Sequence, residues 1–110
     1  METDIFSRLF EVIEERKDAP PENSYVAQLM LKGVEKINSK IIEESAEVCE
    51  AALEPDKKQI LHEICDLMFH TFVLASYRNI SIDEIKSEFV IRFGISGLAE
   101  KAGRKKNESE

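Results

Sequence analysis

The sequence predicts an all-α protein, a helical bundle that a second copy of the chain completes. Apolar residues recur at three- and four-residue spacing through most of the 110 positions, which is the pattern of amphipathic helices. No strand pattern of any length appears, because helical spacing explains the short β-branched runs equally well. Residues 57–78 are apolar on nearly all sides, so their burial requires more surface than the other helices of the chain offer. We therefore expect a homodimer.

Capping and breaking residues divide the chain into five main helices. These are expected over residues 5–17, 25–32, 34–53, 57–78 and 82–92. Short polar side chains that can accept hydrogen bonds from first-turn amides precede four of them, at Thr3-Asp4, Ser24, Asp56 and Ser81. Residues 18–23 must form a loop, because consecutive prolines remove amides and disfavour the α conformation before them. Gly33 and Gly94 end the second and the last of these helices.

Size and composition indicate one domain over residues 1–94, followed by a short helix and a polar tail over residues 95–110. The net charge of −7 argues against binding to a nucleic-acid backbone, which requires a basic surface. No apolar run reaches transmembrane length and the N-terminus lacks a signal-peptide core, so we expect a cytoplasmic protein. Cys49 and Cys65 lie in helical stretches without a CxxC motif, and we expect reduced residues in the core.

Two pairs of acidic residues on consecutive helices are the most informative feature. Glu44 and Glu47 form the first pair, and Glu63 and Asp66 form the second. Positions three apart lie on one side of a helix, so each pair can converge on one point. Glu44 also occupies the middle of an apolar stripe that a helix would bury, made by Ile37, Ile41, Val48 and Ala51. Glu47 lies at the edge of this stripe, and the second pair belongs to the one polar strip of an otherwise apolar helix.

Four carboxylates held near an apolar core require cations between them, because each unpaired buried charge costs several kcal/mol. A set of oxygen ligands suits Mg²⁺, or Mn²⁺, better than zinc. A solvated acidic face is the common alternative for one such pair, since charged residues are mostly exposed. Two pairs on consecutive helices, both set against apolar stripes, favour a metal site instead. Its expected ligands are Glu44, Glu47, Glu63 and Asp66.

The carboxylate pairs and three further stretches resemble known enzymes. The Glu-x-x-Glu and Glu-x-x-Asp pattern is similar to that of the all-α NTP pyrophosphohydrolase superfamily, the MazG-like group. Within it, the chain resembles the phosphoribosyl-ATP pyrophosphohydrolase family in PENSYVAQLMLKG (21–33), KIIEESAEV (40–48) and RFGISGLAEKAGRK (92–105). The resemblance implies a MazG-like bundle and a nucleotide substrate. It also implies hydrolysis of phosphoribosyl-ATP to phosphoribosyl-AMP and pyrophosphate, the second step of histidine biosynthesis.

Further site residues are expected around the carboxylates. Lys40 lies one turn before Glu44 on the same side of its helix, so it can reach a phosphate or pair with Glu44. Glu43 is the leading acidic residue of the family's motif, and we expect it to bind a second metal, to orient water or to remain solvated. His70, one turn after Asp66, is expected to steady Asp66 through a hydrogen bond. The expected catalytic residues are Lys40, Glu43, Glu44 and Glu47.

Substrate contacts are expected from a basic group and from one turn. Arg92, Lys101 and Arg104 belong to the only basic concentration of the chain, and the resemblance covers all three. In an acidic protein, these residues could hold a 5′-phosphate of the substrate. The resemblance also implies that Ser24 and Tyr25 lie near the substrate.

Two other functions remain open on the sequence. A housecleaning nucleotide pyrophosphatase that acts on dCTP or dUTP would share the carboxylate pairs, although the SGLAEKA stretch argues against it. A non-catalytic, metal-binding helical dimer is the second alternative. A di-iron bundle is disfavoured because the chain has no Glu-x-x-His pair, and Gln59 stands three positions before His62.

Overall fold

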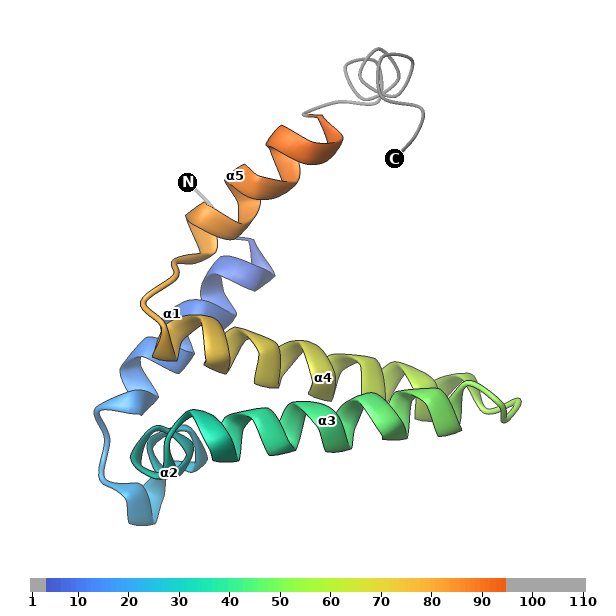
Figure 1. Cartoon of the computed structure of the whole chain (residues 1–110), viewed down its shortest axis with the longest axis horizontal. Helices are drawn as coiled ribbons and strands as arrows, with labels where there is room; N and C mark the ends of the chain where they lie inside the picture. Colours follow the sequence, from blue (N-terminus) through green and yellow to red (C-terminus); the bar gives the residue numbers. More distant parts are fainter. Residues whose placement is uncertain (1–3, 95–110) are drawn as a thin grey trace. The chain divides into compact units, whose positions relative to one another are not determined.

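The computed structural model describes residues 4–94 (Figure 1), and each regular element among them is a helix, as predicted. The order is α1 (Ile5–Lys17), the short 3₁₀ helix η1 (Pro21–Asn23), α2 (Tyr25–Lys32), α3 (Val34–Ala51), α4 (Lys57–Tyr77) and α5 (Ile82–Phe93). The chain divides into two compact units, Met1–Asn79 and Ile80–Glu110. Helices α1 to α4 belong to the first unit and α5 to the second. The predicted boundary after residue 94 coincides with the end of the described residues and stays a prediction.

Side-chain caps start the helices where the sequence predicts them. Asp4, Asp56 and Ser81 each accept hydrogen bonds from amides in the first turn that follows. Glu84 completes the capping box with Ser81, since its side chain accepts from the Ser81 amide at 2.8 Å. Gly33 ends α2 with a φ of +92°, a conformation that glycine adopts without strain.

The observed helices differ from the expected ones mainly at their ends. Helix α3 ends at Ala51, two residues early, and the chain continues as a tighter turn in which the Leu53 amide donates to the Glu50 oxygen at 3.2 Å. Part of the predicted loop forms η1, where the Asn23 amide donates to the Pro20 oxygen at 2.9 Å. Prolines break an α-helix but suit the first position of such a turn, so the proline pair fits both the prediction and the observed geometry.

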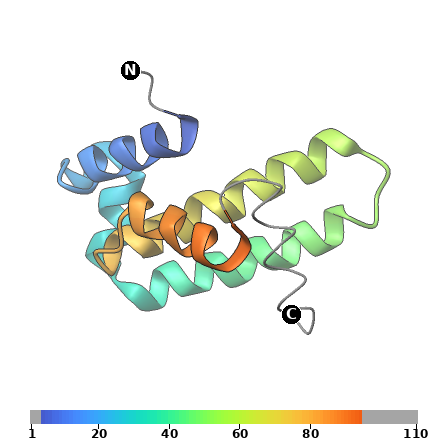
Figure 2. The ribbon, with the colours of Figure 1, turned by 90° about the horizontal axis from the view of Figure 1, so that it is seen from above.

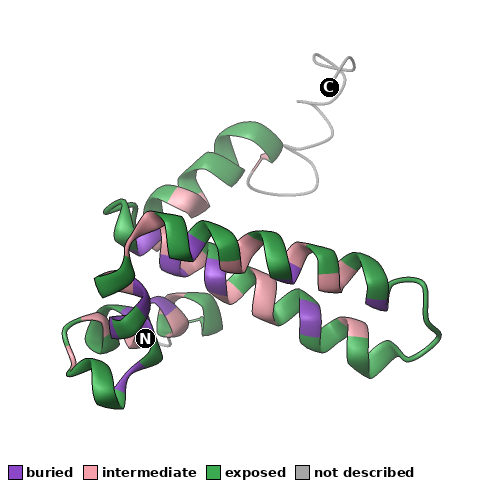
Figure 3. Cartoon of the chain, turned by 60° about the horizontal axis from the view of Figure 1, so that its bottom comes forward, coloured by how far each residue is buried: buried purple, intermediate pink, exposed green. Residues whose placement is uncertain are grey.

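Helices α3 and α4 run antiparallel and side by side as a long hairpin (Figures 1 and 2). Helices α1 and α2 pack on this hairpin at the end where α3 begins and α4 ends. The core at this end contains one or more buried residues from each of the four helices: Ile13, Val26, Leu29, Ile37 and Val73. Figure 3 maps the buried positions onto the helices. Packing from α1 and α2 therefore fixes one end of the hairpin that carries the acidic pairs.

The predicted inner stripe of α3 is confirmed. Ile37 is completely buried, Ala51 is buried, and Ile41 and Val48 are partly buried. Glu44 keeps only 6% of its surface exposed, so a carboxylate does occupy this stripe. The hairpin thus directs an acidic side chain inward, where an apolar one would otherwise pack.

The two hairpin helices also expose apolar side chains. The α3 stripe consists of Ile42, Ala46 and Cys49, and the α4 stripe consists of Leu61, Ile64, Cys65 and Met68. The prediction that Cys49 and Cys65 lie in the core was therefore wrong for the single chain. Cys49 directly follows Val48 of the inner stripe, and one residue turns a side chain by about 100° around the helix axis. Despite this apolar surface, none of the helices within residues 4–94 is long and apolar enough to cross a membrane.

Candidate active site

Three carboxylates from α3 and α4 converge between the two helices. One oxygen each from Glu44, Glu63 and Asp66 lies within 4.8 Å of the other two. Glu63 is buried like Glu44, with 8% of its surface exposed, and Asp66 is partly buried. The three-residue spacing puts the two acidic residues of α4 on one side of that helix, and the hairpin sets Glu44 opposite them. The described residues thus bring three of the four expected ligands together.

Glu44 and Glu63 each bury one oxygen without a hydrogen-bond partner. Within residues 4–94, Glu44 Oε2 and Glu63 Oε1 receive no hydrogen bond from the protein. A buried carboxylate oxygen without a donor costs free energy that a cation can offset. Carboxylate oxygens are also the ligands that Mg²⁺ and Mn²⁺ prefer. The cluster therefore fits a hard divalent cation.

Burial and mutual repulsion favour the protonated form of this cluster. Burial raises the pKa of Glu44 to about 7, and the neighbouring Glu47 and Asp66 carboxylates add to this shift. Burial also raises the pKa of Glu63, with the Glu47 carboxylate as the next cause. A cation bound among these groups would favour their charged forms and oppose both shifts.

Glu47 adjoins the three converging carboxylates without belonging to that group. It is partly buried on α3, almost one turn after Glu44. Its carboxylate interacts with those of Glu44 and Glu63, because it contributes to both raised pKa values. A position next to both buried glutamates is compatible with a fourth ligand, and that role stays a prediction.

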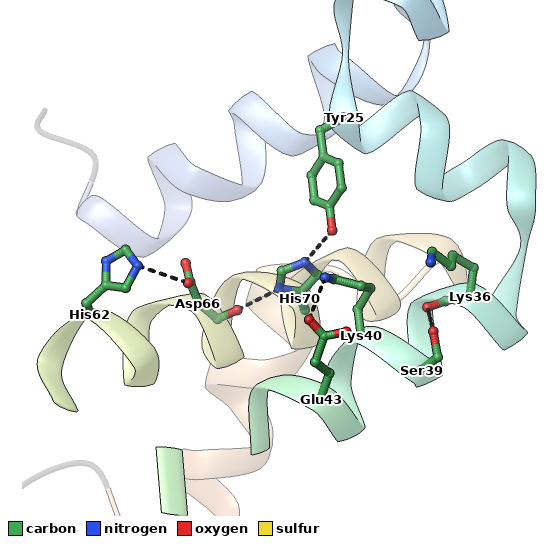
Figure 4. A network of polar contacts seen from close by, with 8 residues as sticks. All are labelled: Tyr25, Lys36, Ser39, Lys40, Glu43, His62, Asp66 and His70. Atoms are coloured by element: carbon green, nitrogen blue, oxygen red, sulfur yellow. Dashed lines mark hydrogen bonds and ion pairs between the residues drawn. The ribbon is translucent and has the colours of Figure 1, made fainter. Parts of the chain in front are cut away.

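Two polar side chains of α4 contact the carboxylates of the same helix. Gln59 Nε2 donates to Glu63 Oε2 at 2.6 Å, and His62 Nε2 lies 3.3 Å from Asp66 Oδ2. Figure 4 shows the second of these contacts. Neither contact was predicted from the sequence, although the four-residue spacing of each pair was a visible signal. Contacts of this kind restrict the rotamers of potential ligands and so orient them.

Lys40 and Glu43 form an ion pair on α3. Lys40 Nζ donates to Glu43 Oε2 at 3.1 Å (Figure 4). This hydrogen bond is the main reason that the pKa of Lys40 lies above its usual value, so the amine stays charged. The sequence left open an ion pair with Glu44, and the observed partner is Glu43 instead. The side chain of Glu43 is 53% exposed, which leaves this pair accessible to a substrate.

Tyr25 and His70 link α2 to α4. Tyr25 Oη lies 2.8 Å from His70 Nε2, and His70 Nδ1 lies 2.8 Å from the main-chain oxygen of Asp66 (Figure 4). The contact of His70 with Asp66, the residue that it was predicted to steady, is therefore with the main-chain oxygen and not with the carboxylate. No sequence pattern pairs Tyr25 with His70, because 45 positions separate them.

Ser24, an expected substrate contact, is buried and uses its hydroxyl within the fold. Ser24 Oγ accepts a hydrogen bond from the Ala27 amide at 3.0 Å and donates one to the Arg16 oxygen at 2.8 Å. These bonds cap α2 and tie its start to the end of α1. Any effect of Ser24 on a substrate would therefore act through the position of α2.

Of the three basic residues expected to bind a phosphate, only Arg92 lies among residues 4–94. Arg92 lies in the second unit, where its guanidinium carbon is 5.2 Å from the ring centre of Phe93. Lys101 and Arg104 lie outside the described residues. The role of this group stays a prediction.

Sequence comparisons extend over nearly the whole chain. The model of a family described as phosphoribosyl-ATP pyrophosphohydrolase matches residues 6–92. A phosphoribosyl-ATP pyrophosphatase from Geotalea daltonii is 47% identical over 104 residues, which cover 94% of this chain and 98% of that protein. Proteins of the same name from Ruthia magnifica and Neisseria gonorrhoeae are 46% and 42% identical, and the matches cover 92% and 91% of this chain and 96% and 94% of theirs. The residues that match the family model include the whole α3–α4 hairpin.

Proposed function

Because the chain belongs to the phosphoribosyl-ATP pyrophosphohydrolase family, we propose that it hydrolyses phosphoribosyl-ATP to phosphoribosyl-AMP and pyrophosphate in histidine biosynthesis. The observation that carries this proposal is the convergence of Glu44, Glu63 and Asp66, with two buried oxygens that lack donors. Cleavage of a triphosphate requires neutralised phosphate charge, an activated water and alignment of the two. A carboxylate cluster suited to a divalent cation meets the first of these requirements.

We propose Mg²⁺ as the cofactor, with Mn²⁺ as a possible substitute. The proposed ligands are Glu44, Glu47, Glu63 and Asp66. When bound, such a cation neutralises phosphate charge and lowers the pKa of a coordinated water. The chain itself supplies the orientation of the ligands. Packed helices hold the carboxylates toward one another, and the hydrogen bond from Gln59 fixes one oxygen of Glu63, so its other oxygen is left for the cation.

Lys40 and Glu43 are proposed to act on the substrate side of the cluster. The charged amine of Lys40 can leave Glu43 and pair with a phosphate oxygen of the substrate instead. In that position the amine would stabilise the negative charge on the departing pyrophosphate. This exchange would release the Glu43 carboxylate, which we propose then orients the attacking water. Arg92, Lys101 and Arg104 are proposed to hold the 5′-phosphate, because an acidic protein needs a local basic group for an anionic substrate. Tyr25 is proposed to contact the substrate directly, and Ser24 through the cap of α2.

We also propose a cytoplasmic homodimer, with a catalytic domain over residues 1–94 and an appended segment over residues 95–110. The α3 and α4 stripes support the dimer, because exposed apolar surface favours association by about 25 cal/mol per Å² buried. Two hairpins can cover these stripes by forming a four-helix bundle around a twofold axis. A second copy presents the same stripes, so the interface can be self-complementary.

Release of pyrophosphate from phosphoribosyl-ATP with Mg²⁺ tests this function. Wild type should release it, whereas Glu44→Gln and Asp66→Asn should each reduce kcat/KM by about a hundredfold or more, since each removes a charged ligand. Glu35→Gln is the matched control, because Glu35 is an exposed glutamate in the first turn of α3, and it should keep wild-type activity. Full activity in either ligand variant would reject the proposed site.

Two other outcomes would overturn the proposed reaction itself. Cleavage of dCTP or dUTP without cleavage of phosphoribosyl-ATP would make the protein a housecleaning nucleotide pyrophosphatase. Binding of Mn²⁺ and nucleotide without turnover of any of these substrates would make it a non-catalytic, metal-binding dimer. Calorimetric titration run beside the pyrophosphate assay distinguishes the two.

A further inference from the structure

The two oxygens of Glu63 have different surroundings. Oε2 accepts a hydrogen bond of 2.6 Å from Gln59 Nε2, whereas Oε1 is buried and receives no hydrogen bond from the residues that the structure describes. Only 8% of the surface of Glu63 is exposed, so little of this side chain is open to water. One oxygen of the carboxylate is therefore already bonded, and the other is left for a ligand.

Gln59 reaches Glu63 from the first turn of α4. The Asp56 side chain caps this helix and accepts hydrogen bonds from the main-chain amides of Lys58 at 3.0 Å and Gln59 at 3.4 Å. Gln59 stands one turn before Glu63 on the same side of the helix. The cap thus fixes the main chain of Gln59, and the side chain of Gln59 holds Oε2 of Glu63 toward the start of α4.

The bond between these two side chains is compatible with a bound cation. A carboxylate that binds a cation is ionised and can only accept hydrogen bonds, so the NH₂ group of Gln59 is the group that can face it. Hydrogen bonds to an ionised oxygen are shorter and stronger than those between neutral groups. Gln59 is uncharged and contributes no charge of its own to the site. Its effect on a cation would therefore act through the orientation of Glu63.

Divalent cations differ in how they use a carboxylate. Mg²⁺ demands octahedral geometry with oxygens at about 2.0–2.1 Å, whereas Ca²⁺ takes about six to eight oxygens at about 2.3–2.6 Å and often binds both oxygens of one carboxylate. Binding through both oxygens of Glu63 would turn Oε2 away from Gln59 and break their hydrogen bond. Binding through Oε1 alone keeps that bond. The contact therefore disfavours the binding mode that Ca²⁺ uses and leaves the mode of Mg²⁺ intact.

We propose that Gln59 is a positioning residue that makes Glu63 bind a cation through one oxygen, so that the site discriminates against Ca²⁺. This inference rests on the proposed function, because it takes the cation site of that function as given. One oxygen from each of the four proposed ligands leaves positions on an octahedral cation for water and for a phosphate oxygen. Gln59 acts on this site without touching the cation.

A variant without the donor tests this role in the absence of turnover. Gln59→Met removes the donor with little change in length or charge, and Gln59 is exposed, so the core stays intact. Mg²⁺ and Ca²⁺ are each titrated against Mn²⁺ bound to the full chain without nucleotide, and electron paramagnetic resonance measures the free Mn²⁺. The ratio of the Kd for Ca²⁺ to the Kd for Mg²⁺ should fall about tenfold from its wild-type value, or by about 1.4 kcal/mol. An unchanged ratio would overturn the inference.

Gln59→Lys separates the hydrogen bond from the charge. A lysine at this position keeps a donor within reach of Glu63, and its positive charge repels both cations alike. Both Kd values should therefore rise, while their ratio should stay at the wild-type value. A ratio that falls as far as in Gln59→Met would mean that a donor at this position does not set the preference, and it would overturn the inference.

Gln28→Met is the matched control. Gln28 is an exposed glutamine on α2, and its Nε2 donates to the main-chain oxygen of Pro21 at 2.8 Å. The substitution removes a hydrogen bond of the same kind away from the carboxylates. Both Kd values should stay as in wild type, and a ratio that falls as in Gln59→Met would overturn the assignment to Gln59.

Infrared spectroscopy reports the binding mode of the carboxylates directly. The antisymmetric and symmetric stretches of a carboxylate lie farther apart in frequency when one oxygen binds a cation than when both do. With Ca²⁺ bound, Gln59→Met should therefore show one more carboxylate in the two-oxygen mode than wild type shows. Identical Ca²⁺ spectra of the two proteins would overturn the inference.

Failure of the inference and failure of the proposed function give different results. A wild-type protein that binds neither Mn²⁺ nor Mg²⁺ and releases no pyrophosphate from phosphoribosyl-ATP would reject the proposed function, and the inference with it. A wild-type protein that binds Mg²⁺ and cleaves phosphoribosyl-ATP, together with an unchanged ratio of Kd values in Gln59→Met, would reject the inference alone.

Discussion

At the scale of single residues, Glu44 combines a cost in stability with a proposed role as a metal ligand. It lies in the inner stripe of α3, where an apolar side chain would pack well, and one of its oxygens is buried without a donor. Burial and the neighbouring carboxylates disfavour its charged form. Residues that break the apolar pattern of a helix in this way are more informative about function than those that follow it.

Replacing this residue should therefore separate stability from activity. Glu44→Gln removes a buried charge, so the metal-free protein at about pH 8 should gain about 1 kcal/mol after solvent screening, or roughly 5 °C in Tm. Thermal unfolding in the presence of a chelator measures this gain. With Mg²⁺ added, wild type should have the higher Tm, because only wild type keeps the full set of ligands for the cation. A metal-free variant less stable than wild type would contradict this account of Glu44.

The residues of the site differ in how visible they are in the sequence. The spacing of Glu63 and Asp66 on one helix is local, so their convergence could be predicted, and the apolar residues around Glu44 predicted its burial. The pairs Gln59 with Glu63 and His62 with Asp66 are also local, and their four-residue spacing on one helix was a signal from which both contacts could have been predicted. The contact between Tyr25 and His70 depends on how α2 packs against α4, and a single sequence holds no spacing rule for such a contact.

At the scale of elements, the helices were predictable because their signals are local. Caps, prolines and helical spacing depend on neighbouring residues only, and they predicted the order of the helices and their starts. The packing of helices on one another is not local. Ser76 illustrates this: it is 1% exposed on α4, and its hydroxyl donates to Glu14 Oε2 of α1 at 2.6 Å. Lys17 joins the same group, 3.0 Å from Glu14 and 3.3 Å from Ser76.

This link between α1 and α4 should make stability depend on pH. The hydrogen bond from Ser76 is the main cause that lowers the pKa of Glu14 below 4.5. A lowered folded-state pKa means that the link stabilises the protein above about pH 4.5 and is lost as pH falls through the folded-state value. Ser76→Ala should therefore lower the urea midpoint at about pH 6, and the difference from wild type should shrink toward about pH 3.

The control for this experiment is Ser39→Ala, which removes an exposed hydroxyl on α3 that bonds only the Lys36 oxygen among the contacts described. The difference in urea midpoint between Ser39→Ala and wild type should not vary with pH. A difference for Ser76→Ala that stays constant from about pH 6 to about pH 3 would show that Glu14 does not sense this bond.

At the scale of the whole molecule, apolar residues are distributed over more surface than one chain can bury. The inner faces of α3 and α4 close on each other and on the short helices α1 and α2. The α3 and α4 stripes remain exposed, and both cysteines belong to them. Periodicity predicted that α4 is apolar nearly all round, but it could not tell which face packs within the chain. The wrong expectation for the cysteines follows from this ambiguity, since an outer face can be as apolar as an inner one.

A second copy of the chain is the simplest partner to cover these stripes. Each copy carries the same hairpin, and a twofold axis places the same surface of each copy in the interface. Sedimentation equilibrium should then give twice the 12.6 kDa mass of one chain. Ile64→Lys puts a charge in the α4 stripe and should shift the protein to monomers, whereas Glu15→Lys, at an exposed site on α1, should not. Cys65, the neighbour of Ile64 in this stripe, should react slowly with a thiol reagent in the wild-type dimer and rapidly in Ile64→Lys. A monomeric wild type with freely reactive Cys65 would leave the stripes open and contradict the dimer.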